Sequence, residues 1–95
     1  MTSAAEVLTA GADLEREQLR ELVDRALVRA CADYALTPKQ REVAVRVFDG
    51  ALYKHIAAEL GMSWRTVRMH TEEVYRKLGV CTRGEMVAKI LGRLS

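Results

Sequence analysis

The segment 63–78, SWRTVRMHTEEVYRKL, constrains this chain more than any other, because its periodicity gives it two different faces. At about 100° per residue, the four side chains suited to a core fall within about 60° of one another: Val67, Thr71, Val74 and Leu78. The opposite face carries Arg65, Arg68, Met69, Glu72 and Arg76. Ser63 can cap the helix start, and Gly79 can end it in a left-handed conformation. We therefore predict a helix over 64–78 that packs on one side and presents guanidinium groups on the other.

A second helix is predicted immediately before this one, over about 53–60. Ile56, Ala57 and Leu60 form its apolar face, and Gly61 makes the turn before the Ser63 cap. Two helices joined by about three residues with a glycine at the turn are typical of a helix-turn-helix. Planar guanidinium groups on the second helix suit the edges of base pairs in duplex DNA, although many such faces are only solvated.

Two further helices flank this unit. Thr37, Pro38 and Gln40 form a capping box with proline in the first turn, so a helix is predicted from about 38 until Gly50. The last helix is predicted over about 83–94, after a capping box at Thr82. It is more apolar than one packed side needs, and we predict that a second subunit contacts it through Met86, Val87, Ile90, Leu91 and Leu94.

The N-terminal third is organised differently. Residues 1–12 are expected to be flexible or a short helical start, because Gly11 interrupts the pattern. From Asp13, which can cap a helix, an apolar stripe continues to residue 35 and predicts an amphipathic helix. This 13–35 helix can pack on its own domain, pair with its copy in a second subunit, or dock on another protein.

Composition and charge exclude several functions. Residues 1–35 carry a net charge of −3 and residues 36–95 carry +5, so the C-terminal part is the one suited to DNA. No apolar run is long enough to span a membrane, and a cytoplasmic protein is expected. The two cysteines, Cys31 and Cys81, are expected to be free thiols. No spacing assembles a nucleophile, a metal site or a cofactor site, and His70 is expected to be structural or to contact a phosphate, so an enzyme is not expected.

Taken together, these residues resemble the LuxR/GerE family of bacterial DNA-binding domains over about residues 36–94. The shared positions are Leu36-Thr37-Pro38, Ile56-Ala57, Thr66-Val67-Arg68, His70, Lys77-Leu78-Gly79-Val80 and Arg83. The resemblance implies a four-helix domain whose third helix enters the major groove and whose last helix contacts a second subunit. It implies DNA contacts at Lys54, Arg65, Thr66, Arg68, Met69 and Glu72. Arg76 is added as a DNA-binding candidate from the outward face, where it is either a phosphate contact or a solvated charge.

The chain departs from the family pattern at three places. Lys39-Gln40 replaces the usual Arg-Glu, and Tyr53 replaces an asparagine. Glu72 stands where a basic or polar residue is common, so negative charge lies on the groove face. Region 4 of bacterial sigma factors shares part of the pattern, but His70 and the segment 77–83 favour LuxR/GerE.

The sequence thus predicts an all-α protein in which a LuxR/GerE-type helix-turn-helix domain, 36–95, follows one extra amphipathic helix. Its expected function is sequence-specific transcriptional regulation as a homodimer on double-stranded DNA, with half-sites about one helical turn apart. The alternative is an interaction module that binds a partner protein through the 13–35 helix and has weak DNA affinity.

Overall fold

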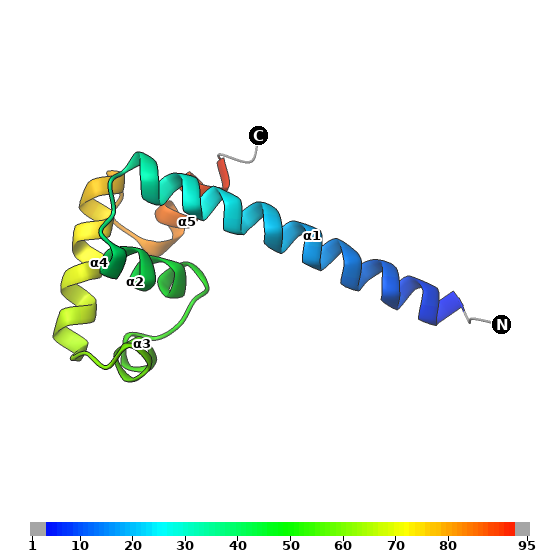
Figure 1. Ribbon diagram of the computed structural model, residues 1–95, viewed down its shortest axis with the longest axis horizontal. Helices are drawn as coiled ribbons and strands as arrows, with labels where there is room; N and C mark the ends of the chain where they lie inside the picture. Colours follow the sequence, from blue (N-terminus) through cyan, green and yellow to red (C-terminus); the bar gives the residue numbers. More distant parts are fainter. Residues whose placement is uncertain (1–3, 93–95) are drawn as a thin grey trace.

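The structure is a computed structural model that describes the backbone of residues 4–92 and the side chains from residue 15 onward. The described part contains five helices and no strand (Figure 1). They are α1 (Ala4–Asp33), α2 (Pro38–Phe48), α3 (Tyr53–Leu60), α4 (Trp64–Leu78) and α5 (Arg83–Leu91). The all-α prediction is confirmed, with the four-helix unit α2–α5 following one additional helix.

Helix α1 begins earlier than the sequence predicts. It runs without a break from Ala4 through Gly11, so Gly11 does not interrupt it and Asp13 is not its cap. A single glycine inside a helix costs only about 1 kcal/mol, and the neighbouring Ala, Glu and Leu residues favour the helical state. The N-terminal half of α1 projects away from the other four helices (Figure 1).

The C-terminal end of α1 turns on a residue that is not glycine. Ala35 adopts φ +54°, and the Leu36 amide donates to the Cys31 carbonyl over 2.9 Å. This is the geometry in which glycine usually follows a helix, so alanine is strained there. The Lys77 ammonium donates to the Ala35 carbonyl over 2.9 Å and fixes the turn against α4.

The helix starts of the four-helix unit are capped largely as predicted. The Thr37 hydroxyl accepts from the Gln40 amide over 3.2 Å while the Gln40 side chain accepts from the Thr37 amide, so this capping box is complete. The Thr82 hydroxyl accepts from the Glu85 amide over 3.1 Å. The Glu85 carboxylate reaches the amide of Cys81 rather than that of Thr82, which makes this second cap an open variant of the predicted box.

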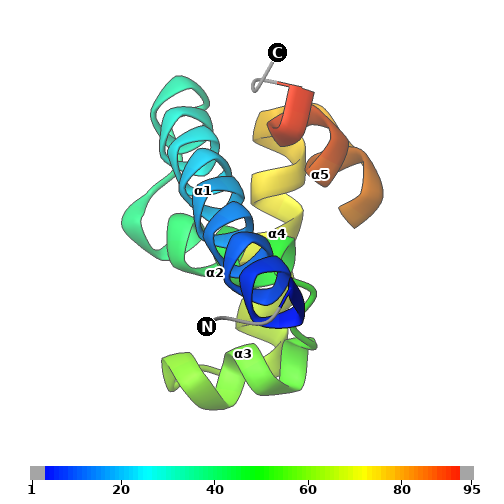
Figure 2. The same cartoon turned by 90° about the vertical axis from the view of Figure 1, so that its right-hand side faces the viewer.

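The core lies where α4 crosses α2 and α3 and where α5 fills the space between α1 and α2. Figure 2, which looks toward the N-terminal end of α1, shows α3 apart from α1 and from α5. The largest fully buried side chains come from α2 to α5: Ile56, Leu78, Met86, Ile90, Val43, Val67, Val74 and Thr71. The four inner residues predicted for the 64–78 helix are all among them. None of the helices in residues 4–92 has both the length and the apolarity to span a membrane.

Two of the five residues predicted for a subunit contact on α5 are buried in the single chain. Met86 and Ile90 are 0% and 2% exposed, because they belong to the core of the single chain and α1 packs against α5. Val87 is half-buried and Leu91 is 38% exposed, while Leu94 lies outside the described residues. Met86 and Ile90 thus belong to the protomer's own core, between α1 and α2, while Val87 and Leu91 keep exposed surface, and a second subunit on α5 stays a prediction.

Candidate nucleic-acid interface

Helices α3 and α4 form the helix-turn-helix, and the turn between them is fixed by backbone geometry. Gly61 adopts φ +63°, which allows the Met62 amide to donate to the Ala57 carbonyl over 3.0 Å. The Ser63 hydroxyl then accepts from the Thr66 amide over 3.1 Å and starts α4. A turn held in this way sets the direction of α4 from the body, so its outer side is presented rigidly.

The outer side of α4 carries the residues predicted to contact DNA. Arg65, Arg68, Met69, Glu72 and Arg76 are all exposed, with Met69 at 53%. Thr66 is half-buried, and its hydroxyl lies 2.8 Å from that of Ser63. Lys54 is exposed in the first turn of α3. The structure therefore brings the predicted α4 residues onto one accessible face, with Thr66 at its edge.

Two of the three guanidinium groups on this face are paired with carboxylates of the same helix. Arg68 Nε donates to Glu72 Oε1 over 3.0 Å, and Arg76 Nη2 donates to Glu73 Oε2 over 2.7 Å. The bond from Arg76 lowers the pKa of the Glu73 carboxyl, and the same bond raises the pKa of the Arg76 guanidinium. Arg65 has no such partner among the described residues. The free chain thus presents one unpaired guanidinium and two that must leave a carboxylate or share it with DNA.

Trp64 joins the two helices at the edge of this face. Its ring meets the Tyr53 ring edge-on, with centroids 6.4 Å apart, as expected for a side chain that packs on the preceding helix. Trp64 as a whole remains 49% exposed, and the Arg68 guanidinium lies 5.8 Å from the centroid of its ring. With Lys54, these rings line a shallow hollow of about 510 Å³. The hollow offers aromatic surface beside a cation, which suits a sugar-phosphate chain.

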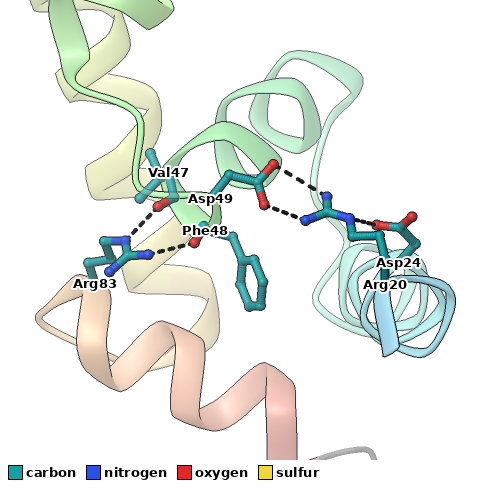
Figure 3. A network of polar contacts seen from close by, with 6 residues as sticks. All are labelled: Arg20, Asp24, Val47, Phe48, Asp49 and Arg83. Carbon is teal, nitrogen blue, oxygen red and sulfur yellow. Dashed lines mark hydrogen bonds and ion pairs between the residues drawn. The ribbon is translucent and has the colours of Figure 1, made fainter. Parts of the chain in front are cut away.

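Three cations of the C-terminal part have structural roles that the sequence did not reveal. Arg83 donates to the carbonyl groups of Val47 and Phe48 over 2.8 and 2.7 Å, at the C-terminal end of α2 (Figure 3). Lys77 donates to the Gln40 side chain over 2.7 Å, and Lys89 donates to the Leu78 carbonyl. Arg83 and Lys89 bind carbonyl groups at the C-terminal ends of α2 and α4, where carbonyl groups lack partners within the helix, and Lys77 binds the Gln40 side chain in the first turn of α2. Part of the positive charge of residues 36–95 is therefore used inside the fold.

The described part of the chain holds no candidate metal site. No group of three or more His, Cys, Asp or Glu side chains in the described residues has the geometry to hold a metal ion. His70 is half-buried on α4, beside Thr71, whose hydroxyl donates to the Val67 carbonyl over 2.9 Å. Cys31 is buried, and burial raises the pKa of its thiol.

A capped second helix with an exposed, arginine-bearing side defines a helix-turn-helix domain of the DNA-binding type. Comparison with known protein families agrees with this class and identifies one family within it. The model of the GerE family, described as bacterial regulatory proteins of the luxR family, matches residues 34–90. The chain belongs to this family, which confirms the resemblance. Family members are DNA-binding transcriptional regulators and not enzymes.

Several curated proteins are similar to this part of the chain. A probable HTH-type transcriptional regulator, GfsR of Streptomyces halstedii, is 36% identical over 61% of this chain and 24% of its own length. The transcriptional regulatory protein UhpA of Escherichia coli is 40% identical over 58% of this chain and 28% of its own length. The probable transcriptional regulatory protein NarL of Mycobacterium tuberculosis is 39% identical, with coverages of 59% and 26%. The matched segment is thus about a quarter of each relative. No solved structure matches the chain significantly.

Proposed function

We propose that this chain regulates transcription by binding duplex DNA in a sequence-specific way, with α4 in the major groove and two copies acting together. The observation that carries the proposal is the division of α4. Its inner residues are held in the core at 0–1% exposure, as for Val67 and Val74, while Arg65, Arg68 and Met69 face solvent. A rigid helix with one accessible side is the element that major-groove recognition requires.

The accessible side supplies groups for both kinds of DNA contact. Arg65 and Arg68 carry planar donors that can bind guanine or a phosphate, and Met69 can contact a thymine methyl group. Lys54, on α3, is suited to a backbone phosphate. We therefore assign base contacts to the middle of α4 and positioning contacts to Lys54 and Arg76.

Glu72 fits this assignment as a selective element. Its carboxylate can accept from the amino group of cytosine, and it repels phosphate wherever that contact is absent. In the free chain it is held by Arg68 at 3.0 Å. We propose that a correct operator satisfies both side chains, while unrelated DNA leaves Glu72 facing the backbone.

The experiment begins with selection of bound sequences from random duplexes by the full chain. Binding of the selected and a scrambled duplex is then measured by fluorescence anisotropy at several salt concentrations. Arg68→Ala is expected to lose about 1–3 kcal/mol on the selected duplex and little on the scrambled one. Lys54→Ala is expected to weaken the binding of both duplexes similarly. The slope of the logarithm of affinity against the logarithm of salt concentration should fall by about one.

Equal losses on both duplexes for Arg68→Ala would contradict its role in base recognition. Arg41→Ala is the matched control, because Arg41 is an exposed cation on α2 that lies outside the proposed interface. Failure of the selection to enrich any sequence, with weak binding throughout, would contradict sequence-specific recognition.

A second candidate function is supported by the carboxylates on α4. Glu72 and Glu73 neutralise two of the three guanidinium groups, and the N-terminal half of α1 projects from the body (Figure 1). Both features suit an interaction module with weak DNA affinity that binds another protein through α1. A chain that fails the selection but binds a partner protein through α1 would favour this function.

A further inference from the structure

Trp64, the only tryptophan of the chain, is the first residue of α4 and lies close to two other side chains. Its indole meets the Tyr53 ring of α3 edge-on, with the ring planes at 61°. The Arg68 guanidinium, one turn further along α4, lies over the same indole. Since about half of Trp64 is exposed, burial in the core does not account for this large side chain.

The Arg68 side chain is held at two points. Besides lying over the indole, it donates from Nε to Glu72 Oε1. Trp64, Arg68 and Glu72 are four residues apart in succession, so neighbouring members of the series lie about 40° apart around α4 and can touch. The terminal nitrogens of Arg68, Nη1 and Nη2, have no hydrogen bond with any described residue. Their donors are therefore available to a partner molecule.

We propose that Trp64 is a positioning residue for base recognition. Its indole and the Glu72 carboxylate hold the Arg68 guanidinium so that Nη1 and Nη2 can meet the edge of a base pair. Guanine is recognised by two donors of one guanidinium, and with Nε engaged the two terminal nitrogens are the pair that is left. The inference rests on the proposed function, in which Arg68 contacts bases, and it gives Trp64 a role that acts through Arg68.

The physical benefit is a smaller loss of conformational freedom on binding. An arginine side chain has several rotatable bonds, and fixing them opposes association. A guanidinium already held by an aromatic face and a carboxylate has less freedom to lose. Attraction between a cation and an exposed ring is weak and changes an equilibrium constant about two- to fivefold. Arg65, by contrast, has neither an ion pair nor a ring contact with a described side chain.

Tyr53 gives the indole a fixed partner on the preceding helix. Tyr53 is half-buried at the start of α3, and the edge-on contact relates the position of the indole to that helix. The same contact suits a simpler role, in which Trp64 only packs α3 against α4. The two roles differ in what they predict for Arg68, because packing alone affects every DNA contact of α4 alike.

The test is a double-mutant cycle on the full chain, with dissociation constants measured for the selected duplex. Trp64→Leu is expected to raise the dissociation constant about two- to fivefold when Arg68 is present. In a chain that already carries Arg68→Ala, it should raise it less than about 1.5-fold, because no guanidinium remains to be positioned. Arg65→Ala is the matched background, in which Trp64→Leu should have its full effect.

The cycle also separates other roles of the indole. A direct contact of Trp64 with the DNA backbone, or packing on α3, would add the same loss in all three backgrounds. Equal losses would therefore overturn the positioning role. Circular dichroism verifies that each variant is folded at the temperature of measurement.

Nuclear magnetic resonance of the free wild-type chain tests the arrangement without DNA and without a substitution. The ring current of the indole should shift the δ-protons of Arg68 upfield of those of Arg65. Equal δ-proton shifts in the two arginines would overturn the contact itself. Zero coupling in the cycle, with sequence-specific binding retained, would overturn the positioning role alone. A chain whose selection enriches no sequence would contradict the proposed function, and this role with it.

Discussion

Replacing Arg83 by methionine separates a structural role from a DNA contact. The substitution keeps the length of the side chain and removes the donors that hold the carbonyl groups of Val47 and Phe48 at 2.8 and 2.7 Å. Arg83 joins α5 to the C-terminal end of α2 and lies against Gly50, where an added Cβ would be 3.4 Å from its Nη2 atom. The variant should therefore be less stable but should still recognise DNA.

The size of the effect follows from the exposure of the two bonds. The bond to Val47 is partly buried and should contribute about 1 kcal/mol, while the bond to Phe48 is exposed and should contribute about 0.5 kcal/mol. A loss of about 1.5 kcal/mol lowers the melting temperature of a domain of this size by roughly 6–12 °C.

Thermal unfolding followed by circular dichroism measures the change directly. Arg41→Met is the control, since it removes the same charge from an exposed position whose side chain has no hydrogen bond among the described residues. Both variants should bind a selected duplex at low temperature within about twofold of the wild type. An unchanged melting temperature for Arg83→Met, together with weakened DNA binding, would refute the structural role and make Arg83 a phosphate contact.

Three further predictions follow from local geometry. Ala35→Gly should raise the free energy of unfolding by about 0.5–1 kcal/mol, because φ +54° strains alanine and not glycine, and a lower melting temperature would contradict this. Glu72→Gln should raise affinity for a scrambled duplex roughly two- to fivefold in low salt, because it frees Arg68 and removes a charge that repels phosphate. Glu73→Gln removes one negative charge at the neighbouring position and should raise affinity for the scrambled duplex less. Equal increases in the two variants would contradict the assignment of the phosphate repulsion to Glu72. Alkylation of the native chain should label Cys81 and not Cys31, with the second label entering only after unfolding, as mass spectrometry can determine.

The sequence predicts the four-helix unit well because local and tertiary signals agree there. Thr37, Ser63 and Thr82 are capping residues in sequence, and each accepts the expected backbone bond in the structure. Gly61 and Gly79 adopt the left-handed conformation that their positions indicate. The spacing of apolar residues over 64–78 predicts the correct inner face of α4, because that pattern and the tertiary packing agree.

The sequence fails where long-range packing decides. It cannot show that Met86 and Ile90 are buried within the single chain, because an apolar residue on a terminal helix looks the same whether it meets its own chain or a second one. It also cannot show that Arg83 bonds the end of α2, 35 and 36 residues away. Gly11 misleads in the opposite direction, since one unfavourable residue does not outweigh a long helical segment.

The central claim is that the outer side of α4 binds DNA while its inner side remains in the core. Nuclear magnetic resonance of the isotope-labelled full chain, titrated with a selected duplex, tests this most directly. The amide signals of Arg65, Arg68 and Met69 are predicted to shift most, with Lys54 affected and the exposed face of α1 around Val28 unchanged. Shifts concentrated on α1, with those of α4 unmoved at saturation, would contradict the account.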